Sequence, residues 1–252
     1  MKRWLLDLAH GLAEAVFPPS CVHCRGMVET PRCGAGAVDG FRHLCPRCVA
    51  QLDFARPPHC TTCGHPFYGV VDGPRRCEKC EGLDPAFGEG RTALIFKGPA
   101  RSLVLELKYH RGLHVLADFG EVFRRAPHVL DLVRGATLVP VPLHPRKARE
   151  RGYNQAALLA ESLASAAGAG TRVEPFLRRV VDTPTQTAFD RRTRMGNLKN
   201  AFALAPRAAL MPDQHLILVD DVFTTGSTLN SCARTLRRAG ALNVDVVTFG
   251  HG

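Results

Sequence analysis

Residues 215–228 read HLILVDDVFTTGST, and this stretch decides the fold. The apolar residues 216–219 predict a buried strand that leads into two adjacent carboxylates, Asp220 and Asp221. A turn of small and hydroxyl residues follows and opens a helix, and Gly226 lets a ligand approach the backbone of that turn closely. Ligands of open parallel sheets bind beyond the carboxyl ends of the strands, where backbone N–H groups and a helix N-terminus attract phosphate. The stretch therefore predicts a phosphate-binding edge of a parallel sheet.

Strand-like and helix-like segments alternate on both sides of this stretch. Strands are predicted at 92–96, 136–142, 215–222 and 243–249, and helices at 100–110, 114–125, 154–166 and 227–239. Such alternation is typical of a parallel sheet whose faces are covered by helices. The predicted α/β domain spans residues 91–252, and a linker with glycine and proline, 81–90, precedes it.

Cysteine pairs dominate the region before the linker, which has little apolar periodicity. Eight of the ten cysteines form four CxxC pairs: Cys21/Cys24, Cys45/Cys48, Cys60/Cys63 and Cys77/Cys80. Pairs of this kind supply thiolates to closed, tetrahedral, structural zinc sites, and an iron–sulfur cluster or redox dithiols are the alternatives. The spacing leaves open which pairs share a metal, and whether His23, His59 or His65 replaces a cysteine. We predict a zinc module at 21–80, with Cys33 and Cys232 outside it.

The first twenty residues form a separate segment. Apolar residues recur there at helical spacing until Pro18, which predicts an amphipathic packing helix at 1–20, with contact to a membrane surface as the alternative. Acidic residues interrupt the apolar stretch, so we do not expect an export signal. No apolar run approaches the roughly 18 residues of a membrane span. We therefore expect a cytoplasmic protein with reduced thiols.

The formal net charge of +10 predicts a polyanionic partner, which is either a phosphorylated small molecule or a nucleic acid. Because the chain has only one tryptophan and three tyrosines, we do not expect a wide surface for stacking bases. The thirteen phenylalanines are expected to pack in the core.

Residues 215–228 resemble the motif with which type I phosphoribosyltransferases bind phosphoribosyl pyrophosphate (PRPP). The resemblance implies a type I phosphoribosyltransferase-like parallel sheet flanked by helices, preceded by a small zinc-ribbon module. It also implies that Asp220 and Asp221 contact the 2- and 3-hydroxyls of the ribose, with Mg²⁺ nearby. The 5-phosphate would be held by Thr224, Thr225, Gly226, Ser227 and Thr228. Transferases that act on 6-oxopurines place a carboxylate where this chain has Thr224, which argues against hypoxanthine–guanine chemistry.

Other segments are similar to the ComF family of competence-associated proteins. They are VPVPLHP at 139–145, RERGYNQ at 149–155, TPTQ at 183–186 and the four CxxC pairs, which match that family's double zinc ribbon. The resemblance implies a basic loop at 143–151 that receives pyrophosphate and a flexible segment that closes over PRPP. The residues implied for pyrophosphate and closure are Arg146, Lys147, Gly152, Asn154, Gln155, Thr183, Gln186, Arg192 and Asn197, and the implied catalytic set is Asp220, Asp221, Arg149 and Arg151.

Two functions stay open on the sequence alone. In the first, the protein is a glycosyltransferase that moves the phosphoribosyl group of Mg–PRPP to an unidentified acceptor. In the second, it is a non-catalytic PRPP- or nucleotide-sensing module that binds single-stranded DNA. The family resemblance implies a role in natural competence and DNA transformation, with a competence helicase or another DNA-uptake protein as partner. The intact PRPP residues favour the enzyme.

Overall fold

The computed structural model describes residues 19–28, 40–69, 71–181, 201–211 and 213–252. Within them a five-stranded sheet has the order β1-β7-β6-β2-β3, and every neighbouring pair is parallel. The strands are β1 (Gly90–Ile95), β2 (Thr137–Pro140), β3 (Arg172–Val173), β6 (His215–Phe223) and β7 (Asn243–His251). A small antiparallel pair, β4 (Leu177–Arg179) and β5 (Phe202–Leu204), lies beside it. The predicted α/β class, a parallel sheet flanked by helices, is confirmed.

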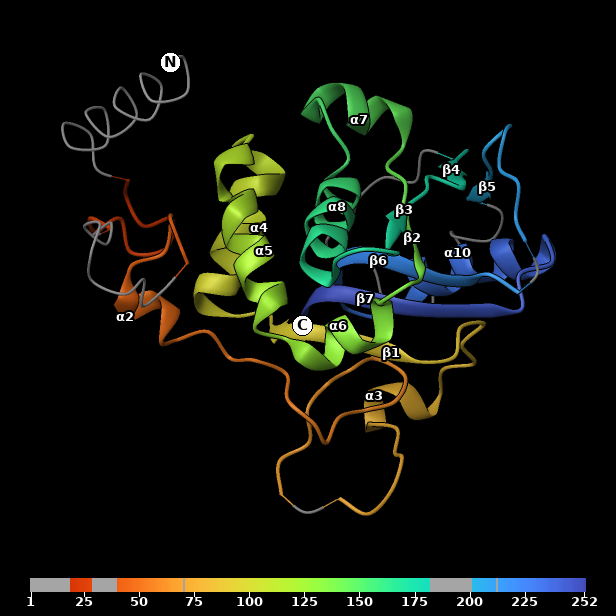
Figure 1. Ribbon diagram of the computed structural model, residues 1–252, viewed down its shortest axis with the longest axis horizontal. Helices are drawn as coiled ribbons and strands as arrows, with labels where there is room; N and C mark the ends of the chain where they lie inside the picture. Colours follow the sequence, from red (N-terminus) through yellow and green to blue (C-terminus); the bar gives the residue numbers. More distant parts are fainter. Residues whose placement is uncertain (1–18, 29–39, 70, 182–200, 212) are drawn as a thin grey trace.

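Helices cover both faces of the sheet, as Figure 1 shows. Their bounds are α4 (Gly98–Tyr109), η1 (Leu113–Val115), α5 (Leu116–Arg124), α6 (Pro127–Val133), α7 (Pro145–Arg151), α8 (Gln155–Ala167) and α10 (Ser227–Arg238). Successive side chains of a strand point to opposite faces. In β6, Ile217 and Val219 accordingly pack with α4, α5 and α8, whereas Leu216 and Leu218 pack with α10. The central strand is therefore buried on both sides.

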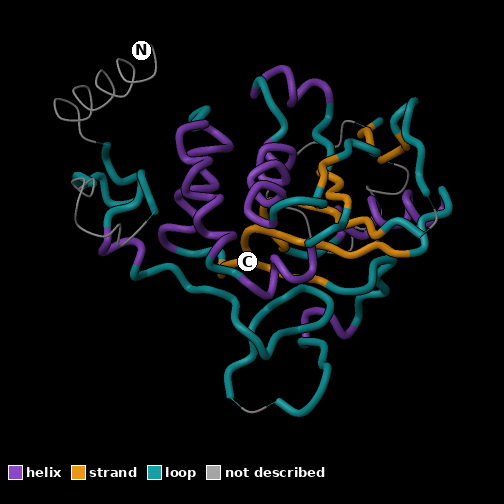
Figure 2. The backbone as a smooth tube through the Cα atoms, viewed as in Figure 1, coloured by secondary structure: helices purple, strands orange, loops and turns teal. Residues whose placement is uncertain are grey.

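The cysteine-rich region packs on the α/β domain in two places (Figures 1 and 2). The first part, with α2 (Pro46–Val49), lies beside α4 and α5, where the buried Asp118 accepts hydrogen bonds from the backbone N–H groups of Arg42 (2.7 Å) and His43 (2.8 Å). The second part, with α3 (Glu78–Glu81), lies along β1, and Gly90 N–H donates to the Thr61 carbonyl at 2.8 Å. Each part therefore belongs to a different hydrophobic cluster.

Three local features differ from the sequence-based expectations. Strand β6 ends at Phe223, one residue later than predicted. The basic segment expected as a loop forms helix α7, because Pro145 suits the first helical position, good helix formers follow it, and Gly152 (φ 89°) ends it. Helix α6 was not predicted, although it too begins with a proline. Over the described ranges, no helix has the length and apolar character needed to span a bilayer.

Candidate functional site

A tight turn joins β6 to α10 at the carboxyl edge of the sheet. Gly226 is the N-cap of α10 and has φ 69°, a value that favours glycine. A Cβ atom at this position would stand 2.6 Å from Cζ of Phe223, so the ring of Phe223 also excludes a larger residue. The Thr225 and Ser227 hydroxyls lie 2.9 Å apart, and Thr228 follows in the first turn of α10. The predicted phosphate residues thus form one compact loop at a helix N-terminus.

The two aspartates lie inside β6 and point to opposite faces of the sheet. The buried side chain of Asp221 faces α4 and α8, where its Oδ2 lies 2.8 Å from Lys108 Nζ and accepts a hydrogen bond from Gln155 Nε2 at 3.0 Å. Asp220 faces the side of α10, close to the buried Cys232. Burial, and then the negative charge of Asp221, raise the pKa of Asp220 to about 7.

Lys108 is a site residue that the sequence reasoning missed. It lies one helical turn after Val104 in α4, on the stripe that also carries the buried Leu103 and Leu107. A lysine on a core-facing stripe is costly to bury without a counter-charge. That position was the available signal, but only the fold shows that the counter-charge is Asp221.

The basic residues of α7 divide into two groups. Arg146 is exposed and pairs with Glu150 at 3.1 Å, and Arg149 is exposed as well, whereas Lys147 is half-buried. Arg151 turns inward: its guanidinium donates to Gln155 Oε1 and lies 5.9 Å from the ring centroid of Tyr109. Through Gln155, the structure therefore connects Arg151 of the predicted pyrophosphate segment to Asp221.

Asn154 positions the next helix. Its Oδ1 caps α8 by accepting from Ala156 N–H at 3.1 Å, and its Nδ2 donates to the carbonyl of Val141 at 3.0 Å. Gly152 supplies the left-handed turn between α7 and α8. Four further residues of the predicted set, Thr183, Gln186, Arg192 and Asn197, lie outside the described residues.

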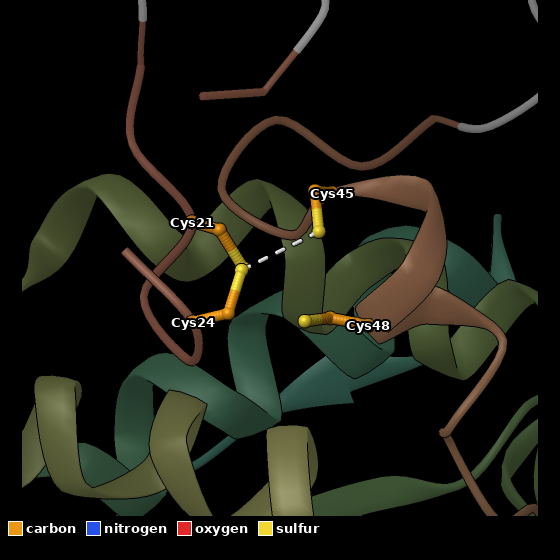
Figure 3. Close-up of side chains that lie close together, drawn as sticks. All are labelled: Cys21, Cys24, Cys45 and Cys48. Carbon is orange, nitrogen blue, oxygen red and sulfur yellow. Dashed lines mark hydrogen bonds between the residues drawn. The ribbon is translucent and has the colours of Figure 1, made fainter. Parts of the chain in front are cut away.

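The CxxC pairs assemble in chain order into two tetrads, Cys21/Cys24/Cys45/Cys48 and Cys60/Cys63/Cys77/Cys80. Figure 3 shows the first, with four side chains converging on one point. Sulfur–sulfur distances of 3.6 Å (Cys24–Cys45) and 3.7 Å (Cys63–Cys77) match the roughly 3.8 Å expected when zinc binds four thiolates tetrahedrally at about 2.3 Å. The open question of pairing is thereby answered in favour of sequential pairs.

The surroundings of the tetrads also fit a structural metal. Cys77 N–H points at the sulfur of Cys60 at 3.3 Å, an interaction that stabilises a thiolate. Burial raises the pKa of Cys21, but hydrogen bonds from neighbouring backbone N–H groups outweigh it and lower the pKa to about 7. Among the described cysteines none is in a disulfide, and neither tetrad includes a histidine. Cys33 lies outside the described residues.

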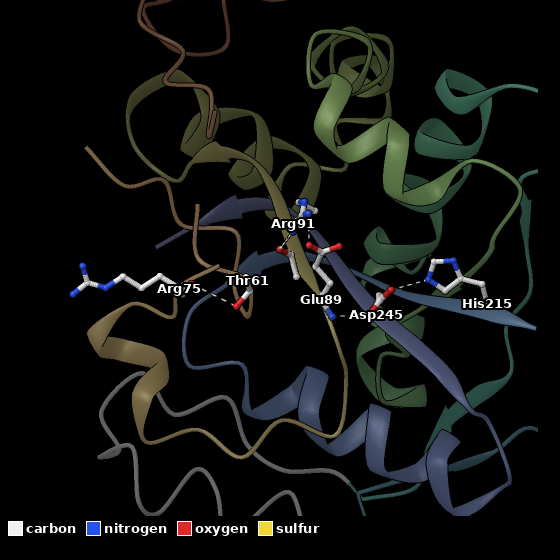
Figure 4. Close-up of polar contacts among 7 residues, drawn as sticks. Thr61, Arg75, Glu89, Arg91, His215 and Asp245 are labelled. Carbon is white, nitrogen blue, oxygen red and sulfur yellow. Dashed lines mark hydrogen bonds and ion pairs between the residues drawn. The ribbon is translucent and has the colours of Figure 1, made fainter. Parts of the chain in front are cut away.

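A second polar cluster lies at the opposite, amino-terminal edge of the sheet (Figure 4). His215 Nε2 lies 2.7 Å from Asp245 Oδ2, and Asp245 Oδ1 accepts from Glu89 N–H at 2.6 Å. Burial raises the pKa of Asp245, but the hydrogen bonds from His215 and Glu89 outweigh burial and hold the pKa below its ordinary value. This cluster joins the starts of β6 and β7 to the residue before β1, and it is remote from the phosphate loop along the strands.

Two cysteine tetrads packed against an α/β domain, with an all-parallel sheet and a strand–turn–helix loop at its carboxyl edge, define a double-zinc-ribbon α/β protein. Residues 12–81 match the family model described as a double zinc ribbon domain. The chain is 32% identical to the DNA utilization protein YhgH of Salmonella typhimurium over 82% of this chain and 88% of that protein. It belongs to the ComF family of competence-associated proteins, as the sequence resemblance predicted.

Two further competence proteins are similar to this chain over most of its length. Competence protein F of Haemophilus influenzae is 29% identical, covering 90% of this chain and 94% of that protein. Competence protein ComFC of Bacillus subtilis is 24% identical, covering 78% and 79%. A hypoxanthine phosphoribosyltransferase structure from Staphylococcus aureus aligns with 53% of this chain and 62% of that chain at 12% identity and a TM-score of 0.34, which is too low to bear on function.

Proposed function

We propose that this protein is a PRPP-dependent phosphoribosyltransferase that acts in DNA uptake and transfers the phosphoribosyl group of Mg–PRPP to an acceptor still to be identified. The observation that supports the proposal is the juxtaposition of Asp220 and Asp221 with the turn at Gly226, at the carboxyl edge of a parallel sheet. Edges of this kind hold ligands in open α/β proteins.

Each part of the edge suits one part of PRPP. The turn and the first residues of α10 would hold the 5-phosphate with backbone N–H groups and hydroxyls. Asp221 would accept a hydrogen bond from a ribose hydroxyl at Oδ1, since both of its recorded contacts use Oδ2. Carboxylate oxygens are also ligands that Mg²⁺ prefers, and Mg²⁺ would neutralise part of the pyrophosphate charge.

Transfer of the phosphoribosyl group develops charge at two places, and each charge needs electrostatic stabilisation. As the bond from the ribose C1 to pyrophosphate breaks, positive charge builds on the ribose, near the carboxylates of β6. Negative charge builds on the leaving pyrophosphate, and Arg149 and Arg151 would be the cations that stabilise it. Such preorganised charges stabilise a transition state without a covalent intermediate.

Calorimetric titration of Mg–PRPP into the zinc-loaded protein tests this function. We expect binding to the parent and none to the Asp220→Asn/Asp221→Asn variant. Binding of equal strength to both proteins, or to neither, would contradict the proposed site. If the parent alone binds, pyrophosphate release in the presence of bases, amines and nucleic-acid components identifies the acceptor.

One observation favours a second function, the handling of single-stranded DNA. Tyr109 is 68% exposed beside Arg151, and the neighbouring Arg111 donates to the Glu150 carbonyl at 3.4 Å. An exposed ring with flanking arginines is a means of stacking a base and contacting its phosphate. Salt-sensitive binding of an oligonucleotide that is weakened by Tyr109→Ala, but not by Asp220→Asn/Asp221→Asn, would favour this function over catalysis.

A further inference from the structure

Lys108 occupies an unusual position for a lysine. Its side chain is 22% exposed and the side chain of Asp221, which it contacts at 2.8 Å, is only 7% exposed. The turn of α4 that carries it is fixed, because the Tyr153 hydroxyl donates to the Leu107 carbonyl. The backbone that carries Lys108 is therefore held in place where the side chain contacts Asp221.

The contact lies at the centre of a short polar chain. Lys108 Nζ and Gln155 Nε2 both reach Oδ2 of Asp221, and Gln155 Oε1 accepts from Arg151. A carboxylate held at one oxygen by a cation and an amide has a fixed orientation, and its other oxygen can serve a ligand. The two donors come from helices on one face of the sheet, α4 and α8.

We propose that Lys108 is a positioning residue for PRPP: it holds Asp221 through Oδ2, so that Oδ1 is presented to a ribose hydroxyl. The inference rests on the proposed PRPP function and adds a residue to it. Lys108 does not touch the ligand in this scheme and acts only through Asp221.

Charge supports the assignment. The Asp221 side chain is only 7% exposed, so it loses most of its hydration, and the Lys108 ammonium at 2.8 Å offsets that loss. The same positive charge opposes the rise in the pKa of Asp220 that burial and the charge of Asp221 cause. Without Lys108, Asp220 would hold its proton more strongly, and Asp221 would lose the contact that orients it.

A salt bridge that only holds α4 against β6 is the competing explanation, and ligand selectivity separates the two. We would titrate Mg–PRPP and Mg–pyrophosphate separately into the zinc-loaded full chain, the Lys108→Met variant and the Lys108→Arg variant. Lys97→Met is the matched control, because Lys97 begins the same helix and pairs with an aspartate, Asp53, at 2.7 Å, but is 61% exposed.

We expect Lys108→Met to weaken PRPP binding by roughly 10- to 100-fold, the loss typical of a hydrogen bond to a charged group. Pyrophosphate binding should change by less than about twofold, Lys108→Arg should recover most of the affinity for PRPP, and Lys97→Met should match the parent. An equal loss of both ligands, or no loss of either, would overturn the positioning role. Absence of PRPP binding to the parent would instead overturn the proposed function and this inference with it.

A double-mutant cycle keeps the test decisive if Lys108→Met does not fold. Asp221→Asn removes the buried charge that would be left unpaired, so Lys108→Met/Asp221→Asn is expected to fold. If Lys108 acts only through Asp221, the double variant binds PRPP as weakly as Asp221→Asn alone. A further loss in the double variant would mean that Lys108 contacts the ligand itself, and would overturn the scheme.

Discussion

At the scale of single residues, Asp220 is held in a place that disfavours its charge. Its folded-state pKa of about 7 lies above the ordinary value of 3.8, because this half-buried carboxyl loses hydration and lies beside the negative charge of Asp221. Between these two values the folded protein binds more protons than the unfolded chain, so stability falls as the pH rises. Functional sites often retain such unfavourable groups.

Asp220→Asn removes this penalty and retains an oxygen that can accept from the backbone N–H of Asp221. We expect the variant to gain on the order of 2 kcal/mol in the free energy of unfolding at pH 8, and clearly less at pH 5.5. Urea unfolding at the two pH values measures the gain. A gain that is the same at both would show that Asp220 has an ordinary pKa.

Gly226 gives a second prediction at this scale. Gly226→Ala introduces a Cβ that meets the Phe223 ring in addition to the cost of φ 69°, whereas a Cβ at Gly135 (φ 73°) would meet no atom within 4 Å. We expect Gly135→Ala to cost about 1 kcal/mol of stability and Gly226→Ala about 1–3 kcal/mol more, since a packed ring must move. Thermal unfolding of the two variants compares them directly, and equal losses would mean that the ring yields freely.

At the scale of elements, the second zinc ribbon supports the turn between β6 and α10. The His65 ring, two residues from Cys63, packs on His251 with centroids 4.7 Å apart, and His251 stacks on Phe223 at 5.5 Å. Phe223 in turn lies against Gly226. Lys79, in helix α3 of the same ribbon, also donates to the carbonyl of Gly252 at 3.3 Å. The first ribbon makes no such contact among the described residues, because it packs on α4 and α5.

Loss of the second metal site should therefore loosen this loop selectively. We expect Cys60→Ser/Cys63→Ser to speed amide hydrogen exchange at residues 223–228 by about tenfold or more, while Cys21→Ser/Cys24→Ser leaves those amides near the parental rate. Exchange followed by mass spectrometry resolves the segment. Equal effects of the two variants would contradict a local support and indicate global destabilisation.

At the scale of the whole molecule, two metal sites attach to two separate cores on opposite faces of one sheet. We expect the purified chain to contain two zinc ions and no absorbance typical of an iron–sulfur cluster. Either double cysteine variant should retain one zinc, with a lower Tm, because closed thiolate sites contribute to folding. Elemental analysis with thermal unfolding tests this, and a single zinc in the parent would contradict it.

The sequence by itself determined the features that depend on neighbours in the chain. The apolar run at 216–219, the glycine turn at 226 and the CxxC knuckles are local patterns, and each fixes backbone geometry within a few residues. That was enough to predict a parallel α/β sheet, a phosphate-type turn and structural metal sites. Helix α7 was local as well, and it was missed because a strongly basic segment was expected to remain a loop.

Only the tertiary structure decided which distant residues meet. Lys108, Gln155 and Asp221 come from three elements, and no spacing along the chain encodes their contact. The same holds for which cysteine pairs share a metal site, and for the packing of His65 on His251. Folding then changes the chemistry of the site, because the raised pKa of Asp220 results from the water that folding removes and from the charge of Asp221 that folding places beside it.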